Sequence, residues 1–308
     1  MKVLIAGELN PDLILSGYRI YPAPGKEVVV DDLSLTLGSA SAICAMGLAR
    51  LGEAVSFLGK VGRDPWGDFC VQQLADAGID TSRMIRSENL KTGITVSLTS
   101  SADRALITYL GAIASLQGSD IGEQALDGVR HIHISSYYLQ QGLRPDCRAV
   151  CAAAHARGIS TSLDPGYDPA EAWGEDVIEV LQEVDIFLPN EVELRGITGC
   201  DSPEDGLRTI ANGQTLTLAK LGRAGCMALD EGDFVRVPAF PMDSIDTTGA
   251  GDSFNAGFIY AWLRNYPLRD AMRIASAAGA ISTMGLGGTG KQASAEEVTL
   301  LCQHAAKS

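Results

Sequence analysis

An aspartate follows two glycines in the segment Asp246-Thr247-Thr248-Gly249-Ala250-Gly251-Asp252-Ser253-Phe254. The glycines allow a tight turn that leaves backbone N–H groups pointing outward where an amphipathic helix begins, and these groups form an anion site together with the helix dipole. The carboxylate of Asp252 stands at the mouth of this site, where it could take a proton from a hydroxyl as a phosphoryl group arrives. A helix cap is the structural alternative for Asp252, but the flanking Asp-Thr-Thr and Ser-Phe favour phosphoryl transfer.

Further polar residues follow expected strands, at the points where these strands end. They are Asn10, Asp12, Asp164, Asn190 and Glu193. Each of them alone is typical of an Asx turn or a helix cap. The carboxyl ends of parallel strands meet at one edge of a sheet, however, and ligands bind there. Their shared position therefore predicts a binding site.

The rest of the chain alternates strands with helices. Strands are expected at residues 1–7, 55–59, 131–135, 159–163, 185–188 and 216–220, and helices at 39–51, 64–78, 202–213, 252–265, 268–284 and 294–306, with another that ends at Arg157. Repeated βαβ units of this kind predict a mostly parallel sheet with helices on both faces. We expect a single domain that spans residues 1–308.

Two blocks do not fit this parallel sheet, because their apolar residues alternate with polar ones. Residues 27–37 alternate in this way, and residues 94–109 do so on both sides of an expected turn at 100–104. Alternation with a period of two predicts a sheet with one face exposed or covering a cleft. We therefore expect a small β lid from segments at about 13–37 and 92–111. Its apolar face could pair two copies into a homodimer.

The composition excludes several classes of partner. A chain of 308 residues, 46% of them hydrophobic, is long enough for a full core. The 24 basic and 38 acidic residues give a net charge of −14, which repels nucleic acids and anionic membranes. Seven scattered cysteines without a Cys-x-x-Cys pair indicate reduced thiols in the cytoplasm. We expect a soluble protein, because no apolar run is long enough to cross a bilayer.

In these motifs the sequence resembles the ribokinase family, the PfkB-type carbohydrate kinases, and the resemblance spans essentially the whole chain. It implies a ribokinase-like α/β fold of three layers, α/β/α, with a mostly parallel central sheet and a small β lid. It also implies a kinase that uses ATP and Mg²⁺. By the same resemblance, Asp252 would deprotonate the acceptor hydroxyl, and the backbone N–H groups of Gly249, Ala250 and Gly251 would stabilise the transferring phosphoryl group.

The resemblance assigns binding residues outside this segment as well. Asn190 and Glu193 match the family's Asn-x-x-Glu motif, which organises Mg²⁺ and phosphate through water. The nucleotide side would comprise Asn190, Lys220, Gly222, Gly225, Thr248, Gly249, Gly251 and Ala278. The substrate side, where an Asn-x-Asp motif contacts sugar hydroxyls, would comprise Asn10, Asp12, Gly38, Ser39, Ser41 and Asp252. Asp246 and Thr248 could ligate a monovalent cation such as K⁺, as in several relatives.

The chain departs from the family pattern on the substrate side. The family's first signature has a second glycine and, four residues later, an asparagine that bonds the sugar, whereas this chain has Ser39 and Ile43. Isoleucine cannot hydrogen-bond a hydroxyl, so we expect the pocket to recognise its substrate differently, with Ser39 and Ser41 as smaller donors. The segment Asp164-Pro165-Gly166-Tyr167 likewise stands where many relatives have Asp-Pro-Asn followed shortly by arginine.

These patterns predict an ATP-dependent kinase that phosphorylates a hydroxyl of a sugar or sugar-like small molecule, expected to be a hydroxymethyl group. A nucleoside kinase of the same family is one alternative, and a catalytically idle sugar or nucleotide sensor that retains the fold is another. A nicotinamide-dependent dehydrogenase ranks last. It would need Gly-x-Gly-x-x-Gly after the first strand, where the chain has Gly7-Glu8-Leu9-Asn10.

Two histidines and three polar residues after them are candidates for a metal site and for substrate contacts. His131 and His133 lie on an apolar strand with no further ligands at a matching spacing, so we expect structural histidines rather than a metal site. Tyr137, Tyr138 and Gln140 follow that strand at a junction expected to face the cleft, where they could contact substrate.

Overall fold

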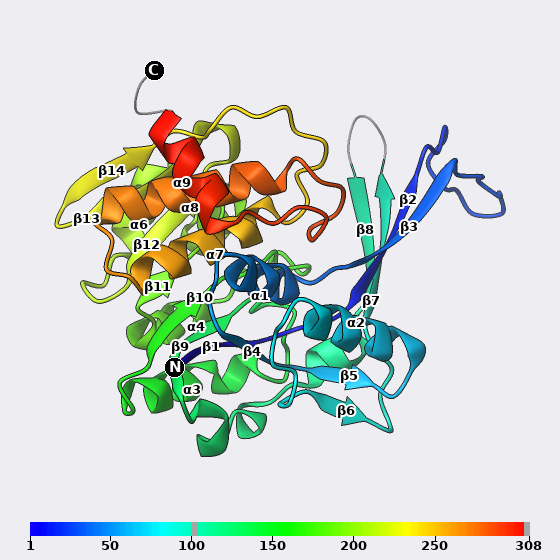
Figure 1. Ribbon diagram of the computed structural model, residues 1–308, viewed down its shortest axis with the longest axis horizontal. Helices are drawn as coiled ribbons and strands as arrows, with labels where there is room; N and C mark the ends of the chain where they lie inside the picture. Colours follow the sequence, from blue (N-terminus) through cyan, green and yellow to red (C-terminus); the bar gives the residue numbers. More distant parts are fainter. Residues whose placement is uncertain (100–103, 305–308) are drawn as a thin grey trace.

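A central sheet of eight strands, in the order β14-β13-β12-β11-β10-β9-β1-β4, runs through the protein (Figure 1). The structure is a computed structural model that describes residues 1–99 and 104–304. The strands are β1 (Lys2–Ala6), β4 (Val55–Leu58), β9 (Val129–Ile134), β10 (Ser160–Leu163), β11 (Ile186–Phe187), β12 (Leu216–Lys220), β13 (Cys226–Asp230) and β14 (Asp233–Val237). All neighbours from β4 to β12 pair in parallel, which confirms the prediction of a mostly parallel sheet.

One edge of the sheet is an antiparallel hairpin that the sequence pattern did not predict. Strands β13 and β14 pair with each other, and β13 pairs with β12. The link between them is Glu231-Gly232, with φ angles of 47° and 93°. Two consecutive positive φ angles make the type of two-residue turn that matches the twist of a hairpin. Its usual sequence signal is Asn-Gly or Asp-Gly, and Glu-Gly is a weak one.

Helices cover both faces of the sheet. One face carries α3 (Cys147–His155), α4 (Asp176–Val180), α5 (Glu191–Thr198) and α6 (Pro203–Ile210), and the other carries α1 (Ala40–Arg50), α2 (Pro65–Asp76), α7 (Ala250–Trp262), α8 (Leu268–Ser282) and α9 (Ala295–His304). Along β1 the side chains alternate between the two cores, with Leu4 and Ala6 in the first, and Val3 and Ile5 in the second. The three-layer α/β/α fold is therefore confirmed.

Several helices begin where capping residues stand in the sequence. Asp64 accepts a hydrogen bond of 2.9 Å from the N–H of Gly67 at the start of α2, and Pro65 is the first residue of this helix. Ser202 caps α6 in the same way. Helix α7 differs, because its N-cap is Gly249, which has no side chain to donate or accept.

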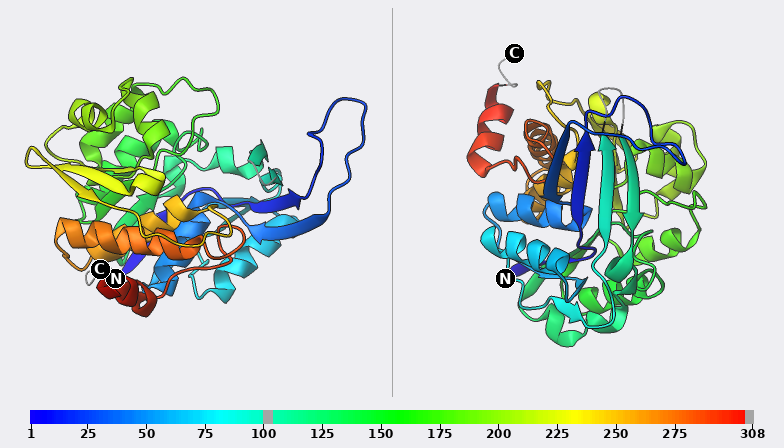
Figure 2. Two further views of the ribbon diagram at one scale, coloured as in Figure 1. Left: turned by 90° about the horizontal axis from the view of Figure 1, so that it is seen from above. Right: turned by 90° about the vertical axis from the view of Figure 1, so that its right-hand side faces the viewer.

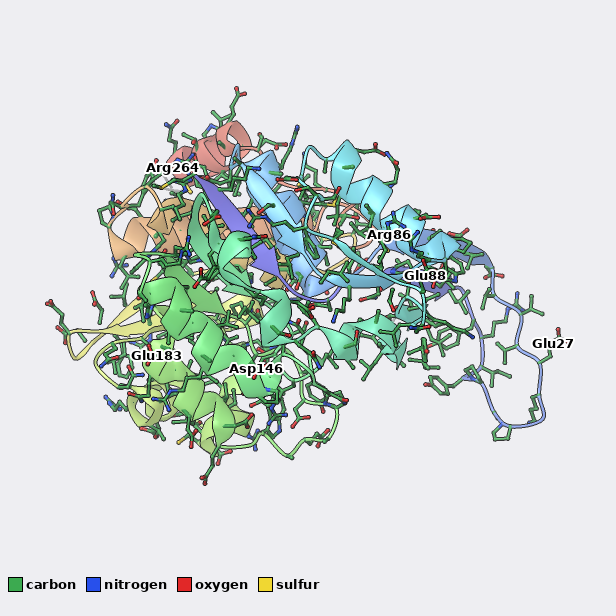
Figure 3. The ribbon with its side chains drawn as sticks, turned by 90° about the horizontal axis from the view of Figure 1, so that it is seen from below. Glu27, Arg86, Glu88, Asp146, Glu183 and Arg264 are labelled. Atoms are coloured by element: carbon green, nitrogen blue, oxygen red, sulfur yellow. The ribbon has the colours of Figure 1, made fainter. Side chains whose placement is uncertain are left out.

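A second sheet, of four strands in the order β3-β2-β7-β8, stands beside this body (Figure 2). Its strands are β2 (Pro11–Ser16), β3 (Asp32–Leu37), β7 (Ile94–Thr99) and β8 (Arg104–Tyr109). These segments agree with the expected lid, except that residues 17–31 form a loop that projects beyond the sheet, with Glu27 near its tip (Figure 3). Most of the expected turn lies outside the described residues. A separate ladder pairs β5 (Lys60–Gly62) with β6 (Ile85–Ser87).

The two faces of the lid differ in polarity. Strand register brings Leu13, Leu15, Leu33, Leu35, Val96, Ile107 and Tyr109 to one face. Four of these, from β3 and β8, are more than two-fifths exposed. The opposite face carries mainly Asp, Ser and Thr side chains, and it contacts the body, because the Nδ2 of Asn10 donates to Thr95 Oγ1 at 3.2 Å. We call the apolar side the outer face of the lid.

Within the part of the chain that the structure describes, no helix is both long enough and apolar enough to span a membrane.

Candidate active site

A cavity of about 650 Å³ opens at the carboxyl ends of the parallel strands. Sequence-predicted residues on its wall are Asn190, Glu193, Lys220, Gly222, Gly225, Gly249, Ala250, Gly251 and Asp252. We call Asn190, Glu193, Lys220 and residues 249–252 the transfer centre. Ala40, Leu106, Ser136, Gly166 and Tyr167 also line the cavity, and we call them the acceptor half. We call the remaining wall the nucleotide side.

The turn before α7 leaves backbone groups directed at the cavity. Gly249 has a φ of 73°, in the left-handed region, and no side chain caps the helix within the described residues. A methyl group placed on Gly249 would lie 2.8 Å from the Cα of Gly288, so only glycine fits here. Asp252 lies in the first turn of α7 and is half-buried. The arrangement joins an anion-binding helix start to one carboxylate.

Asp246 fixes this turn from outside the cavity wall. Its Oδ1 accepts hydrogen bonds from the N–H of Thr248 at 2.9 Å and from Thr248 Oγ1 at 2.7 Å. Its Oδ2 accepts a hydrogen bond of 2.9 Å from the N–H of Gly287. The carboxylate therefore ties the turn to the glycine-rich loop after α8.

A buried ion pair lies beneath the turn. Lys220 Nζ donates to Asp164 Oδ2 at 2.6 Å, and Asn255 Nδ2 donates to the same oxygen at 2.6 Å. Burial opposes charge on both partners, but their mutual attraction outweighs it, so that the pKa of Asp164 is lowered and the pKa of Lys220 is raised. A methyl group on Gly251 would lie 3.6 Å from Lys220 Nζ. The ammonium group is therefore charged and adjacent to the anion site.

Asn190 and Glu193 form a reciprocal capping box at the start of α5. The N–H of Asn190 donates to Glu193 Oε2 at 2.7 Å, and the N–H of Glu193 donates to Asn190 Oδ1 at 2.9 Å. Glu193 is only 5% exposed. Burial, followed by repulsion from Asp164, raises the pKa of Glu193 to about 8. A cation near this carboxylate would favour its charged form.

A buried carboxylate that sequence reasoning missed organises the acceptor half. Glu8 follows β1, and its Oε1 accepts hydrogen bonds from the N–H of Ser41 at 3.1 Å and from Ser136 Oγ at 2.9 Å. Ser41 Oγ donates to its other oxygen. Burial raises the pKa of Glu8, although these hydrogen bonds oppose the shift. The only signal in the sequence was an acidic residue in the first strand-to-loop junction.

The substitution of serine for glycine at position 39 has a structural explanation. Ser39 has a φ of 76°, which glycine adopts freely and serine adopts only under strain. Its Oγ offsets part of that strain by donating to the carbonyl of Glu8 and by accepting from the N–H of Ala42 at the start of α1. Ser136, with a φ of 52°, is strained in the same way and also bonds to Glu8.

The other substrate-side residues meet at the base of the lid rather than on the cavity wall. Asn10 Nδ2 donates to Asp12 Oδ1 at 3.1 Å. A methyl group on Gly38 would lie 2.0 Å from the same Asp12 oxygen. Three of the predicted residues are therefore brought together, where β2 and β3 leave the body.

Ile43 packs against the turn before α7. It is 3% exposed, and a methyl group on Gly288 would lie 2.1 Å from its Cδ1. A methyl group on Gly249 would lie 3.0 Å from the same carbon. The isoleucine therefore supports the anion site by packing, at a position where the family asparagine would bond the sugar.

The nucleotide side contains residues that sequence reasoning missed. Ala278 is 2% exposed and belongs to the core. Its neighbours Ser276, Gly279 and Ala280 on α8, and Thr283 just after the helix, line the cavity together with Arg223, Phe240 and Met242. Arg223 had a signal, since it lies between the predicted Gly222 and Gly225. The aromatic and methionine side chains come from a loop with no motif.

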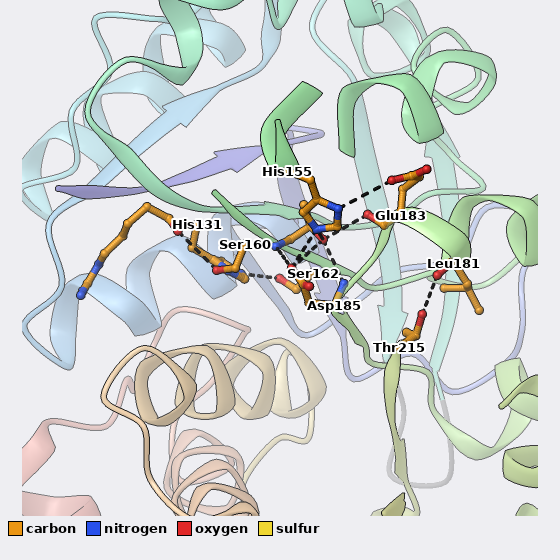
Figure 4. Close-up of polar contacts among 10 residues, drawn as sticks. His131, His155, Ser160, Ser162, Leu181, Glu183, Asp185 and Thr215 are labelled. Atoms are coloured by element: carbon orange, nitrogen blue, oxygen red, sulfur yellow. Dashed lines mark hydrogen bonds and ion pairs between the residues drawn. The ribbon is translucent and has the colours of Figure 1, made fainter. Parts of the chain in front are cut away.

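Three residues after β9 and two histidines within it are buried away from the cavity wall. Tyr137, Tyr138 and Gln140 are buried, and the hydroxyl of Tyr137 donates to Asp176, so the expected contact with substrate is wrong for these three. His131 bonds to Ser160 and Ser162 at 2.8 and 2.7 Å (Figure 4). Burial lowers the pKa of His131 to about 3 and of His133 to about 4. Both rings are neutral and hydrogen-bonded, which agrees with a structural role.

Comparison with known proteins gives consistent matches over the whole length. The family model "pfkB family carbohydrate kinase" matches residues 1–294. An uncharacterized sugar kinase of Archaeoglobus fulgidus is 30% identical over 229 residues, covering 74% of this chain and 91% of that protein. A ribokinase of Haemophilus influenzae is 27% identical over 310 residues, with 98% of each chain covered. An E. coli protein named as a ribokinase II candidate, solved in complex with ATP and Mg²⁺, has a TM-score of 0.86 at 22% identity, covering 98% of this chain and 99% of that chain.

Proposed function

The chain belongs to the pfkB family of carbohydrate kinases, and from this premise we propose that it transfers the terminal phosphoryl group of ATP to a hydroxyl, of hydroxymethyl type, on a sugar or sugar-like molecule. One observation carries the proposal. Asp252 and the N–H groups of the turn before α7 border the same cavity as Lys220 and Glu193. A carboxylate, an anion site and a fixed ammonium group in one cavity are the components that phosphoryl transfer needs.

Each component has a separate task in the mechanism. Asp252 takes the proton of the acceptor hydroxyl as it attacks, which contributes roughly 10²–10⁴-fold to the rate. The N–H groups of residues 249–251 are already oriented by the helix start, and they bind the oxygens of the transferring phosphoryl group without rearranging. Lys220, held by Asp164 at 2.6 Å, adds positive charge that needs no reorganisation during the reaction.

The site also fits Mg²⁺. Asn190 and Glu193 supply oxygen atoms, and Mg²⁺ usually takes one or two protein oxygens and keeps water and phosphate oxygens as its other ligands. When bound, Mg²⁺ would neutralise charge on the phosphates. The E. coli structural neighbour contains ATP and Mg²⁺, which supports the same pair of cofactors here.

We assign ATP to the nucleotide side. Phe240 and Met242 offer apolar surface for an adenine ring on the wall that also carries Gly279. Arg223 is exposed on the wall next to Gly222 and Gly225, in reach of phosphate oxygens. A K⁺ requirement, through Asp246 and Thr248, is part of the proposal and is tested by replacing K⁺ with choline in the assay.

Replacing Asp252 tests the mechanism. Asp252→Asn should lower kcat by roughly 10²–10⁴-fold while nucleotide affinity, measured by calorimetry, changes little. Asp233→Asn, an exposed acid on β14, is the control for the same change in net charge. Equal turnover by the Asp252→Asn protein would remove the mechanism. If the unaltered protein binds sugars and ATP but forms no ADP, the idle sensor becomes the better explanation.

We also propose a homodimer through the outer face of the lid. Leu33, Ile107 and Tyr109 are each more than half exposed, and apolar patches of this kind mark interaction sites. In a symmetric dimer, the outer faces of the two lids can cover each other. Ile107→Glu should convert a dimer into a monomer in sedimentation experiments, whereas Ile178→Glu on α4 should not.

The cytoplasm is the proposed location. All seven cysteines have free thiols, and five of them are buried. Reduced thiols of this kind suit a reducing compartment. Microscopy of a fluorescent fusion in cells would test the location directly.

A further inference from the structure

Tyr167 is the aromatic residue of the acceptor half, and it lies on a loop between β10 and α4, at residues 165–173, which we call the Tyr167 loop. We infer that Tyr167 determines which acceptors are used, because the flat face of its ring packs against the ring of a closed-ring sugar and leaves open-chain polyols without this contact. The inference rests on the proposed kinase function and deepens it by naming the form of the acceptor and the residue that selects it.

The ring of Tyr167 is available to a ligand. The residue is 49% exposed and lines the cavity. Its hydroxyl donates to the carboxylate of Glu171 four residues later, so the polar end of the side chain already has a partner. The aromatic ring is then the part of this side chain that a ligand can use. Small-molecule sites combine apolar and aromatic surfaces of this kind with a few polar groups that fix orientation.

The position of this ring is fixed by an aromatic stack. Trp173 packs edge-to-face against Tyr167, with 5.4 Å between the ring centroids and 89° between the ring planes. On its other contacts, Trp173 packs against the buried Tyr138 at 5.5 Å, and a methyl group on Gly196 of α5 would lie 2.4 Å from the indole. The stack therefore connects Tyr167 to the core. A ring that is already held in place loses little conformational freedom when a ligand packs on it.

The Tyr167 loop has a strained backbone. Glu171 and Trp173 have φ angles of 50° and 45°, which are costly for residues other than glycine. The carboxylate of Asp168 offsets part of this cost, since it accepts hydrogen bonds of 2.9–3.0 Å from the N–H groups of Ala170, Ala172 and Trp173. Backbone strain of this kind clusters at functional sites. In this loop it places Trp173 behind Tyr167, so that the tyrosine ring stays on the cavity wall.

The start of the loop brings Tyr167 next to the other parts of the cavity. The N–H of Gly166 donates to Asp164 of the buried ion pair at 2.9 Å, and a methyl group on Gly166 would lie 2.9 Å from the Cα of Ser136. Leu106, which is 56% exposed on the side of the lid opposite the outer face, lines the same cavity. A sugar ring on Tyr167 therefore shares one cavity with an apolar side chain of the lid and with the transfer centre.

Matched closed-ring and open-chain acceptors test the inference. The pairs are 1,5-anhydro-D-glucitol with D-glucitol and 1,4-anhydro-D-ribitol with ribitol, and all four compounds carry a hydroxymethyl group. We would measure calorimetric binding without ATP, and ADP formation with ATP and Mg²⁺, for both pairs and for D-ribose, D-fructose and uridine. Covering one face of a tyrosine ring, roughly 50 Å² of apolar surface, corresponds to about tenfold in affinity. We therefore expect the closed-ring compounds to bind about tenfold more tightly than their open-chain partners.

Variants of Tyr167 show whether the ring is responsible. Tyr167→Ala should raise the Kd and the KM of the best closed-ring acceptor by about tenfold, and kcat and the KM of ATP should stay within about twofold. A general loss of structure would change all four values. Tyr167→Leu, which keeps an apolar side chain without a flat face, should lie between the two and serves if the alanine variant is unstable. Tyr167→Phe should rescue the affinity, because it loses only the bond to Glu171. Tyr266→Ala, at an exposed tyrosine after α7, is the control and should change neither constant.

The outcomes separate this inference from the kinase function. If Tyr167→Ala weakens the binding of closed-ring compounds but no compound yields ADP, the kinase function fails and the role of Tyr167 stands. If ADP forms and Tyr167→Ala leaves the Kd and KM of the acceptor unchanged, the inference is wrong and the kinase function stands. The inference is also wrong if open-chain compounds bind as tightly as their closed-ring partners, if no closed-ring compound binds, or if Tyr167→Phe loses as much affinity as Tyr167→Ala.

Discussion

The transfer centre and the acceptor half are built from different atoms of the chain. The transfer centre combines the backbone N–H groups of residues 249–251 with the side chains of Asn190, Glu193, Asp252 and Lys220. The ion pair of Lys220 with Asp164 beneath it is almost fully buried. The acceptor half consists of side chains from the lid, from α1 and from two loops. A phosphoryl group is the same in every reaction of this kind, so its site can be a fixed feature of the backbone. The acceptor changes between enzymes, so its site depends on side chains that can be replaced.

Backbone strain divides the two regions in the same way. At the transfer centre the left-handed residue is Gly249, for which a positive φ carries no steric penalty. On the acceptor side, Ser136 on the cavity wall and Ser39 next to it also have positive φ angles and hold them through hydrogen bonds to Glu8, while Gly166 has a φ of 63°. At the two serines, side-chain hydrogen bonds rather than the absence of a side chain determine the backbone path.

The largest expected effect concerns the buried ion pair. Lys220→Met should lower the free energy of unfolding by about 3–5 kcal/mol, because Asp164 is then left buried without its partner. Urea denaturation would measure it. Arg236→Met, which breaks an exposed pair with Glu204, should change stability by less than about 1 kcal/mol. Equal losses of stability in both variants would mean that the buried ion pair contributes no more to the folded state than the exposed one.

A methyl group at the anion turn should affect both stability and turnover. Gly249→Ala strains a left-handed residue and contacts Gly288, so we expect a loss of about 2–3 kcal/mol. Displacing the turn should also reduce kcat by about 10²-fold. Gly158 also has a positive φ, 69°, but nothing lies within 4 Å of an added Cβ. Gly158→Ala should therefore lower the free energy of unfolding by about 1–2 kcal/mol and leave kcat unchanged. The comparison fails if both variants retain full turnover.

Glu193 should make stability depend on pH. Its pKa is about 8 in the folded chain, above its ordinary value of 4.5, so the folded chain holds a proton that the unfolded chain has released between these values. This contribution is therefore fully present below about pH 4.5 and is lost as the pH rises to about 8, by at most about 1.4 kcal/mol per pH unit. Denaturation at pH 5, 6.5 and 8 should show a slope that Glu193→Gln reduces and that Glu179→Gln, at an exposed position, does not.

The smallest expected effect concerns Ser39, the strained serine beside the acceptor half. Ser39→Ala and Ser39→Gly both lose the hydrogen bonds of the hydroxyl, but only alanine keeps the left-handed strain, so Ser39→Ala should be less stable than Ser39→Gly by about 1–2 kcal/mol. Ser202 also caps a helix, but its φ is −96°. The difference between alanine and glycine should therefore be about 1 kcal/mol smaller at position 202. Equal differences at the two positions would show that Ser39 carries no strain.

The sequence predicted what depends on local pattern. Most strands and helices, the lid strands and the turn before α7 followed from periodicity and from glycine, proline and capping residues close to one another in the chain. The short helices α4 and α5 were not predicted. The β13–β14 hairpin was missed because its turn residues, Glu231-Gly232, are an uncommon pair for that geometry. The loop at residues 17–31 continues the apolar composition of its strands, so its end could not be located.

Contacts between distant segments could not be predicted. Glu8 acquires its role through Ser41 and Ser136, which lie 33 and 128 residues away along the chain. Ile43 acquires its role through Gly288, on a different loop. The family resemblance marked both Ser39 and Ile43 as departures, but only the φ angle of the first and the packing of the second give the physical reason.

The lid joins the body through the acceptor residues themselves. Strand β2 follows β1 after only residues 7–10, and β3 enters α1 through Gly38 and Ser39. Any tilt of the lid therefore displaces Asp12 at the start of β2 and the connection that carries Glu8 and Asn10. Closure of the lid and binding of the substrate are therefore coupled, and a molecule that fits poorly against these residues would keep the lid open.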